Sequence, residues 1–459
     1  MIRNFALSLT RLVCQTTMAL FVTIVLTSAA FAQNDLIKPG NILFFNRYTS
    51  DPANPQTNNT QINITNVSRT TEVNVHLFMV ENGSGQVADS FLQLTPTQTV
   101  SFLASDFDPG IQGKIYAVAV NRQTWEPVQV NSLIGSFYVR EANGRSFSQQ
   151  AIPLAALPPG VTDGFSAPVE SEETALAKVP TVVEQFGCSG CPNKLGSVLF
   201  FTRYTSNPSN PNLSDTRISI SGGSIRNPMT IHLFMVDGST CSVADLYIRG
   251  GGSFLASELD PGIEGYIVAV AVDDNGAPTQ SNTLSGSATI LEEDGRTATL
   301  PALPFAKLSP GSVAPVDGVA DLNFDNVDYE RLPNSVAVAS FNSQQTDSTY
   351  LTIFSPARNL GIGSADSVSV FALLYDDAEI ALSSGFSFRC YRNDSFLRLF
   401  NRSGGINRHV PAGRTGWISM NSGRPLLGSV ISQGPIFNGG HNLHVLGFAT
   451  GYSISVPVY

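Results

Sequence analysis

The chain has 459 residues, a formal net charge of −10 and 42% hydrophobic residues. This acidic balance argues against nucleic acid and anionic membrane surfaces as partners, because both attract basic patches. The apolar content argues against a disordered chain, and the length is enough for about three domains.

The first 32 residues are typical of a secretory signal peptide. Arg3 and Arg11 precede the apolar run Met18–Ala32, which ends in a small-x-small Ala-Phe-Ala cleavage pattern. The run is shorter than the roughly 20 residues that span a bilayer. We expect residues 1–32 to be removed, and the mature chain to lack a transmembrane helix. The protein would then be secreted, in the extracellular medium or at the cell surface, or else lie in the periplasm.

The mature chain contains a tandem duplication. Residues 40–50 (GNILFFNRYTS) and 196–206 (GSVLFFTRYTS) are identical at eight of eleven positions. Residues 101–113 (SFLASDFDPGIQG) match residues 253–265 (SFLASELDPGIEG) at ten of thirteen. Such self-similarity indicates repeated domains. We name residues 34–157 copy 1 and residues 196–304 copy 2.

Within each copy, β-branched and aromatic runs recur about every ten residues, separated by Gly, Pro, Asn and Asp. This pattern predicts an antiparallel sandwich or barrel. The AVAV run from Ala117 is apolar on both faces, so its strand should be central. The QINITNV run (61–67) alternates apolar and polar residues, which predicts a strand with one face in water.

The last part of the chain repeats the same order more loosely. Residues 336–354 take the place of the first two strands, residues 367–377 that of the VHLFMV strand, and residues 416–429 that of two late strands. We name residues 336–459 copy 3. The predicted fold is therefore all-β, with two similar antiparallel β-sandwich-like domains and a divergent third.

Two segments separate the copies. Residues 158–195 carry an acidic run and a C-x-x-C motif, and residues 305–335 are rich in Pro, Gly, Asp and Asn. Both compositions are typical of linkers. We expect both segments to be exposed connectors.

Three motifs recur as a set: LFFxRYTS, VHLFMV (IHLFMV in copy 2) and SFLASxxDPGIxG. Together they resemble the repeats of secreted bacterial tandem-repeat β proteins of uncharacterised function. The resemblance covers copies 1 and 2, whereas copy 3 lacks the DPG signature. It implies an exported repeat protein and supplies no activity, ligand or functional residue.

His76 and His232 are the histidines that copies 1 and 2 share. They could be ligands or general bases, but a catalytic histidine needs a placed partner. Phe371 stands at the corresponding position of copy 3. We therefore interpret both histidines as packed, hydrogen-bonded residues.

Arg47 with Asp89, and Arg203 with Asp245, recur in the same way. Such pairs could bind an anionic ligand. We interpret them as internal ion pairs that hold a strand to a loop.

Asp108 and Asp260 each begin an Asp-Pro-Gly string. Calcium would need six or more oxygen ligands from several loops, whereas Asp-Pro-Gly is first of all a turn sequence. The turn is the preferred interpretation, and a calcium site stays the alternative.

The C-x-x-C motif is formed by Cys188 and Cys191. Pro192 stands where haem attachment needs His, and a zinc ribbon needs a second C-x-x-C. In an exported protein, we expect a local disulfide, or a bridge from this linker to Cys241.

His441 and His444 have a spacing that suggests metal ligands on a helix. The surrounding sequence predicts a strand, in which positions three apart face opposite ways. We assign no metal site there. The sequence likewise provides no catalytic residue and no cofactor site that we can assign.

The leading hypothesis is a non-enzymatic envelope or extracellular-matrix protein. Its repeated domains would bind envelope polysaccharide or other surface proteins, and gain avidity from several sites on one chain. The alternative is a secreted carbohydrate- or ester-active enzyme with its site in copy 3. Five acids and histidines found only in copy 3 favour this alternative, namely Asp376, Asp377, His409, His441 and His444.

Overall fold

The computed structural model divides the chain into two compact units, Met1–Asp35 and Leu36–Tyr459. The first unit, with the expected signal peptide, lies outside the described residues, as do Cys188, Cys191, Asp108 and Asp260. The structure describes residues 38–82, 86–107, 111–144, 146–154, 195–207, 209–211, 214–224, 227–259, 264–291, 297–342, 348–363, 366–376, 380–400, 415–433 and 439–459.

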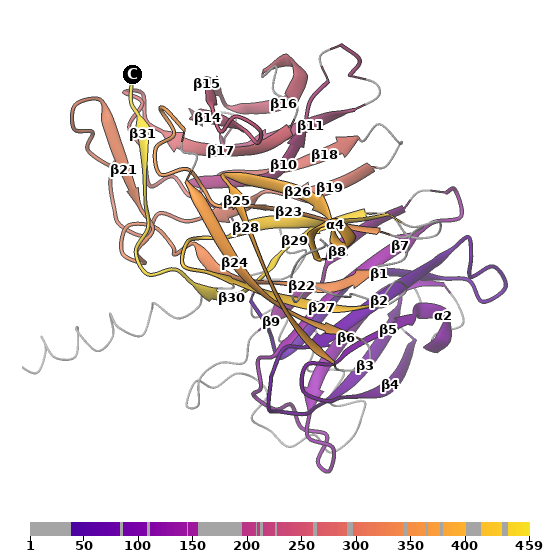
Figure 1. Ribbon diagram of the computed structural model, residues 1–459. Helices are drawn as coiled ribbons and strands as arrows, with labels where there is room; N and C mark the ends of the chain where they lie inside the picture. Colours follow the sequence, from indigo (N-terminus) through magenta and orange to yellow (C-terminus); the bar gives the residue numbers. More distant parts are fainter. Residues whose placement is uncertain are drawn as a thin grey trace, which may run out of the picture. The chain divides into compact units, whose positions relative to one another are not determined.

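Copy 1 is built from two antiparallel sheets (Figure 1). The five-stranded sheet has the order β4 (Val87–Leu94), β3 (Val73–Glu81), β6 (Ile111–Val120), β1 (Ile42–Ser50) and β9 (Ile152–Leu154). The four-stranded sheet has the order β5 (Thr99–Leu103), β2 (Asn59–Asn66), β7 (Leu133–Arg140) and β8 (Ser146–Gln150). The short helix α2 (Ala104–Phe107) follows β5.

Copy 2 has the same strand order. Its five-stranded sheet runs β15 (Val243–Arg249), β14 (Thr230–Asp237), β17 (Glu264–Val272), β10 (Val198–Thr205) and β20 (Leu303–Phe305). Its four-stranded sheet runs β16 (Gly251–Leu255), β11 (Asp215–Ser221), β18 (Ser285–Leu291) and β19 (Thr297–Pro301). The 3-10 turn η2 (Ala256–Glu258) and the hairpin of β12 (Gly223–Ser224) and β13 (Asn227–Pro228) complete it.

Copy 3 has this strand order as well. Its five-stranded sheet runs β25 (Ala381–Arg389), β24 (Ser367–Asp376), β27 (Thr415–Ser422), β22 (Pro333–Asn342) and β30 (His444–Phe448). Its four-stranded sheet runs β26 (Tyr391–Ser395), β23 (Ser348–Phe354), β28 (Leu427–Gln433) and β29 (Gly439–Asn442), and α4 (Phe396–Phe400) follows β26. The predicted all-β class with antiparallel sandwich-like domains is confirmed.

The register of the strands explains the most closely matched segments. In each five-stranded sheet, the first strand of the copy has a β-bulge, and the aromatic residue after the bulge pairs with a glycine, as Tyr48 does with Gly113. A Cβ on Gly113 would overlap the backbone of Val80. The glycine is therefore needed for close approach, and the same pair recurs as Tyr204 and Gly265.

The AVAV strand is central, as predicted. Ala117 and Ala119 of β6 belong to the core between the two sheets, whereas Val118 and Val120 belong to a second apolar cluster on the opposite face. Burial on both faces explains why this strand has no polar alternation.

The prediction of a wet face for the QINITNV strand is wrong. Asn63 and Thr65 of β2 are fully buried. Strands β2 and β7 of copy 1 pack against β22 of copy 3, and Thr65 Oγ1 donates a hydrogen bond to the carbonyl oxygen of Ala339 at 2.8 Å. The polar face is covered by another copy and satisfied by hydrogen bonds across that contact.

The segment 305–335 is not an exposed connector. Its strand β21 (Val319–Asn323) pairs with β31 (Ser453–Pro457), and the two lie side by side in Figure 1. Phe324 and Tyr329 are fully buried in a cluster with Phe200 of copy 2. The sequence does not predict this burial, because Phe324 and Tyr329 stand among turn-forming Asn and Asp residues.

A disulfide joins copies 2 and 3. It links Cys241, in the turn before β15, to Cys390, between β25 and β26. The expected bridge from the linker to Cys241 is therefore wrong, because the partner is Cys390, 149 residues away. Of the helices in the described parts of the chain, none is both long and apolar enough to cross a membrane.

Candidate functional site: a pocket at the junction of the three copies

The last strands of the three four-stranded sheets meet one another. These are β8 of copy 1, β19 of copy 2 and β29 of copy 3, which occupy equivalent places in their sheets. In copy 3, Asn442 ties this junction to copy 2, because its Nδ2 donates to the carbonyl oxygen of Pro301 at 2.7 Å and its Oδ1 accepts from Thr202 Oγ1 at 3.0 Å.

Two glycines allow β29 to insert between its neighbours. A Cβ on Gly439 would lie 2.7 Å from Cβ of Ser148 in β8. A Cβ on Gly440 would lie 3.2 Å from Cβ of Ala298 in β19. The Gly-Gly pair before His441 is thus a signal of close backbone approach on both sides.

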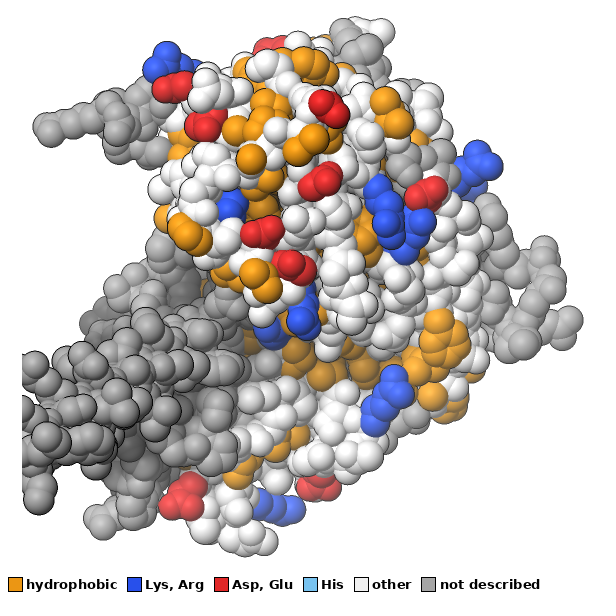
Figure 2. All heavy atoms as spheres, turned by 90° about the vertical axis from the view of Figure 1, so that its left-hand side faces the viewer, with side chains coloured by type: hydrophobic (Ala, Val, Ile, Leu, Met, Phe, Trp, Pro, Cys, Tyr) orange, Lys and Arg blue, Asp and Glu red, His pale blue; other side chains and the backbone are white. Residues whose placement is uncertain are grey.

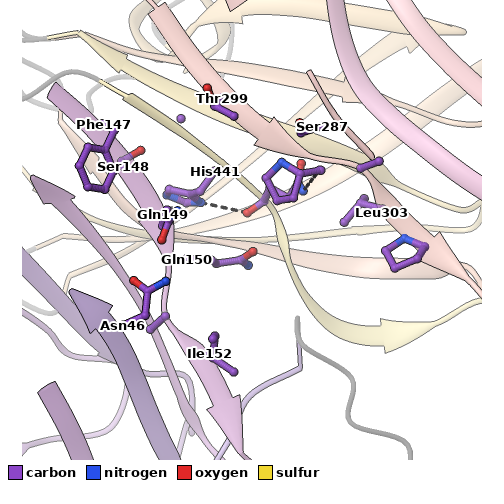
Figure 3. Close-up of a pocket in the computed structure, with 16 residues that line it drawn as sticks. Asn46, Phe147, Ser148, Gln149, Gln150, Ile152, Ser287, Thr299, Leu303 and His441 are labelled. Carbon is purple, nitrogen blue, oxygen red and sulfur yellow. Dashed lines mark hydrogen bonds between the residues drawn. The ribbon is translucent and has the colours of Figure 1, made fainter. Parts of the chain in front are cut away.

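A pocket of about 510 Å³ opens at this junction, a size usual for small-molecule sites. His441 belongs to copy 3. In Figure 3, the labelled side chains of copy 1 lie on one side of His441 and those of copy 2 lie on another side. The described polar lining consists of amides, hydroxyls and one imidazole, from Asn46, Ser148, Gln149, Gln150, Ser287, Thr299, His441 and Asn442. The apolar lining includes Phe147, Ala151, Ile152, Pro301, Ala302, Leu303 and Pro304.

Three buried polar atoms of this lining have no hydrogen-bond partner among the residues that the structure describes. They are Ser148 Oγ, Gln150 Nε2 and His441 Nε2. An unsatisfied buried polar group costs about 1–3 kcal/mol, and most such groups in proteins are paired. Their concentration around one pocket leaves it with hydrogen-bonding capacity that the described residues do not use.

His441 is held as a neutral hydrogen-bond acceptor. Its Nδ1 donates to the carbonyl oxygen of Asn442 at 2.9 Å, which leaves a lone pair on Nε2. Burial lowers the pKa of His441 to about 4. At neutral pH the pocket therefore offers three hydrogen-bonding groups. His441 Nε2 is an acceptor, the Gln150 amide nitrogen is a donor, and the Ser148 hydroxyl can donate or accept.

His444 does not lie on the same strand as His441. Strand β29 ends at Asn442 and β30 begins at His444, so the two histidines belong to different sheets of copy 3. Their ring centroids are 6.1 Å apart and both rings are buried. Burial lowers the pKa of His444 well below its usual range. The expectation of opposite faces on one strand is wrong, because the chain turns at Leu443.

His76 and His232 are packed and hydrogen-bonded, as predicted. Both are 1% exposed. His76 Nε2 lies 3.0 Å from Asp89 Oδ2, and His232 Nε2 lies 2.7 Å from Asp245 Oδ2, so each carboxylate accepts a bond from the imidazole. Burial lowers the pKa of His232, against the opposing effect of Asp245.

The strand register places Phe371 in the position of these histidines. Phe371 pairs with Asn421 of β27, as His76 pairs with Val118 of β6. Phe371 is 51% exposed, however. Gly385 stands opposite Phe371, where copy 1 has Phe91 opposite His76.

The predicted pairing of Arg47 with Asp89 is wrong. Arg47 Nη2 instead donates to Glu141 Oε1 at 2.6 Å, and Asp89 bonds to His76. In copy 2, Arg203 is buried and Asp245 bonds to His232. The aspartates orient histidines rather than arginines.

Of the described candidate enzyme residues of copy 3, His441 and His444 lie close together, whereas Asp376 lies at the end of β24 in the five-stranded sheet. Asp376 Oδ1 accepts the backbone N–H of Ile380 at 2.8 Å at the end of β24. His441 lies in the other sheet, and Asp377 and His409 lie outside the described residues. Within the described ranges, no group of three or more His, Cys, Asp or Glu side chains could hold a metal ion.

Charged side chains do not gather into one field on the face drawn in Figure 2. Acidic and basic groups are interspersed over the described part of that face, with hydrophobic side chains between them.

No signal in the sequence distinguishes Ser148 and Gln150 as pocket residues, because they line the pocket only where the copies pack together.

The fold and the pocket define an all-β protein with three sandwich-like pairs of sheets and a pocket lined by residues of all three copies. No family model matches the sequence, and no curated protein matches it. Among solved structures, the chain is similar to dimeric latent PorU from Porphyromonas gingivalis, at 8% identity and a TM-score of 0.16, covering 92% of this chain and 34% of that chain. It is also similar to the Streptomyces avermitilis alpha-L-rhamnosidase complexed with L-rhamnose, at 10% identity and a TM-score of 0.15, covering 90% of this chain and 44% of that chain. These scores carry no argument about function.

Proposed function

We propose that this protein is an exported, non-enzymatic binding protein whose junction pocket takes a neutral saccharide of the cell envelope or extracellular matrix. The observation that carries the proposal is the set of unpartnered buried atoms on Ser148, Gln150 and His441 around one pocket. An acceptor, a donor and a hydroxyl side by side suit neighbouring hydroxyl groups of a sugar. The apolar lining suits the C–H faces of its ring.

The charge of the pocket supports a neutral ligand. Its described lining contains no acid, lysine or arginine, and His441 is neutral because burial lowers its pKa to about 4. An anionic sugar would lose its hydration without gaining a counter-charge. Glycoside hydrolysis commonly uses a pair of carboxylates, so this lining favours binding over hydrolysis.

Export is supported by the disulfide between Cys241 and Cys390. Disulfides persist mainly in oxidising compartments. This agrees with the signal-peptide pattern of residues 1–32 and with the resemblance to secreted bacterial repeat proteins.

The test is calorimetric titration of the purified exported chain with neutral oligosaccharides released from the envelope of its source cells. We expect saturable binding, and about tenfold weaker binding by Gln150→Met, which removes one unpaired donor at similar volume. The thermal unfolding midpoint should not fall, because the lost donor has no partner in the unliganded protein.

The matched control is Gln112→Met, at an exposed position of β6. It should bind as the unmodified chain does. Equal affinity of the Gln150→Met variant, or tighter binding of uronic-acid oligosaccharides than of neutral ones, would contradict the proposal. Sugar release during the titration would favour the enzyme alternative.

A further inference from the structure

Copy 1 carries an exposed pair of aromatic rings away from the junction pocket. Phe91 of β4 and Trp125 of the loop after β6 are each 40% exposed, and their ring centroids are 4.3 Å apart. The buried ring of His76 stacks on Phe91 at 3.9 Å. The buried imidazole of His76 therefore supports the ring of Phe91.

The backbone of Trp125 lies in the left-handed region, with φ of 59°. The corresponding loop of copy 2 has Gly276 there, with φ of 77°, and both loops are closed by an equivalent bridge to a proline. A side chain in this region is strained, whereas glycine is not. Non-glycine residues in strained conformations cluster at functional sites.

The loop holds the indole in a defined place. The N–H of Trp125 donates to the carbonyl oxygen of Asn121 at 2.8 Å, and Asn121 Oδ1 accepts the N–H of Gln123 at 2.8 Å. A ring that is already ordered loses little entropy when a ligand packs on it.

Copy 2 places the exposed ring of Tyr459 near the position equivalent to Trp125. The ring of Tyr459 lies 6.3 Å from His232, the same separation as between Trp125 and His76. A Cβ on Gly276 would lie 3.3 Å from the Tyr459 carbonyl oxygen. Tyr247, which stacks on His232 as Phe91 stacks on His76, is 39% exposed, so exposed aromatic rings stand at the equivalent places of both copies.

We propose that Phe91 and Trp125 form a second sugar-binding surface, which packs against the C–H face of a pyranose ring in a neutral polysaccharide. The electron-rich face of an aromatic ring attracts weakly positive C–H groups. Asp89 lies two residues from Phe91 on the same face of β4, and its side chain is 36% exposed. Its carboxylate accepts hydroxyl donors and disfavours an anionic polymer.

This inference rests on the proposed class of ligand but concerns a different surface. The chain has two tryptophans, and Trp417 is 2% exposed with its indole N–H bonded to the carbonyl oxygen of Thr97. Acrylamide quenching of fluorescence therefore reports mainly on Trp125. Hydroxyethylcellulose is the neutral probe, and polygalacturonate is the anionic one.

We expect hydroxyethylcellulose to protect the fluorescence from quenching in a saturable manner, and polygalacturonate to have little effect. In affinity electrophoresis, which needs no fluorescent reporter, the variant Trp125→Gly should bind the neutral polymer about tenfold more weakly than the unmodified chain does. Its unfolding midpoint should stay near that of the unmodified chain, since relief of the strained φ by glycine offsets the lost packing of the indole on Phe91. Loss of binding could then not be attributed to misfolding.

The matched control is Asp317→Gly, at an exposed left-handed position with φ of 51° and no ring to lose. It should bind normally. Absence of protection by the neutral polymer, or undiminished binding by Trp125→Gly, would overturn the inference. If oligosaccharide titration still depends on Gln150 in that case, the junction pocket stands and only the second surface falls.

Discussion

His441 makes the stability of the protein sensitive to acid. Its pKa is lowered from 6.5 to about 4 by burial, so between these values the unfolded chain binds a proton that the folded chain does not. The contribution of neutral His441 to the free energy of unfolding is therefore fully present above about pH 6.5 and is lost as the pH falls toward 4. Between pH 7 and pH 5 the loss is about 2 kcal/mol, and His444 acts in the same direction.

Urea unfolding at pH 7 and pH 5 measures this effect. We expect the unfolding free energy to fall over this interval, and to fall less in His441→Phe, which has no titrating group at that position. A variant with the same pH dependence as the unmodified chain would show that His441 is not the group responsible.

The disulfide is the covalent element between copies 2 and 3. It closes a loop of 149 residues, which in the chain-entropy view restricts the unfolded state strongly. Replacing Cys241 and Cys390 together by Ser should lower the unfolding free energy by about 2–5 kcal/mol. Denaturant titration without reductant checks this, and equal unfolding free energies of the double variant and the unmodified chain would contradict it.

Strand β29 depends on its first glycine. Gly439→Ala would place a Cβ 2.7 Å from Cβ of Ser148, so β8 and β29 must separate. We expect a loss of about 1–3 kcal/mol in unfolding free energy, together with weaker saccharide binding at the junction. Gly423→Ala, whose Cβ would meet nothing within 4 Å, is the control, and equal stability of the two variants would argue against close approach at the junction.

The sequence predicts the strands better than their surroundings. Alternation and turn residues identify the elements, and the double apolar face of the AVAV run correctly places β6 at the centre of its sheet. The same rule fails for Asn63 and Thr65, because a polar strand face looks alike whether it meets water or another copy. The composition of residues 305–335 likewise misleads, because the burial of Phe324 and Tyr329 depends on packing against copy 2.

The pocket could not be predicted from any one copy. His441 is conspicuous in the sequence, and the Gly-Gly pair before it signals close approach. Ser148 and Gln150 gain their role only where β8 meets the other copies. The site therefore belongs to the packing between repeats, which local patterns do not encode.

At the scale of the whole molecule, the three copies belong to one compact unit, Leu36–Tyr459. Sequence repetition suggested separate modules that gain avidity from several sites. The proposed pocket is instead a single site to which equivalent edge strands contribute unlike side chains. Divergence among the copies thus supplies the donor, the acceptor and the apolar face of the proposed binding site.

The most direct test of this account is a nitrogen NMR spectrum of the exported chain with labelled histidines, titrated with neutral envelope oligosaccharide. The chain has five histidines, and His441→Phe assigns the signal of interest. We predict that the Nε2 resonance of His441 moves to the range of a hydrogen-bonded acceptor as the saccharide saturates the pocket, while the signals of His76 and His232 stay in place. Saccharide binding that leaves the His441 resonance unchanged would contradict the central claim.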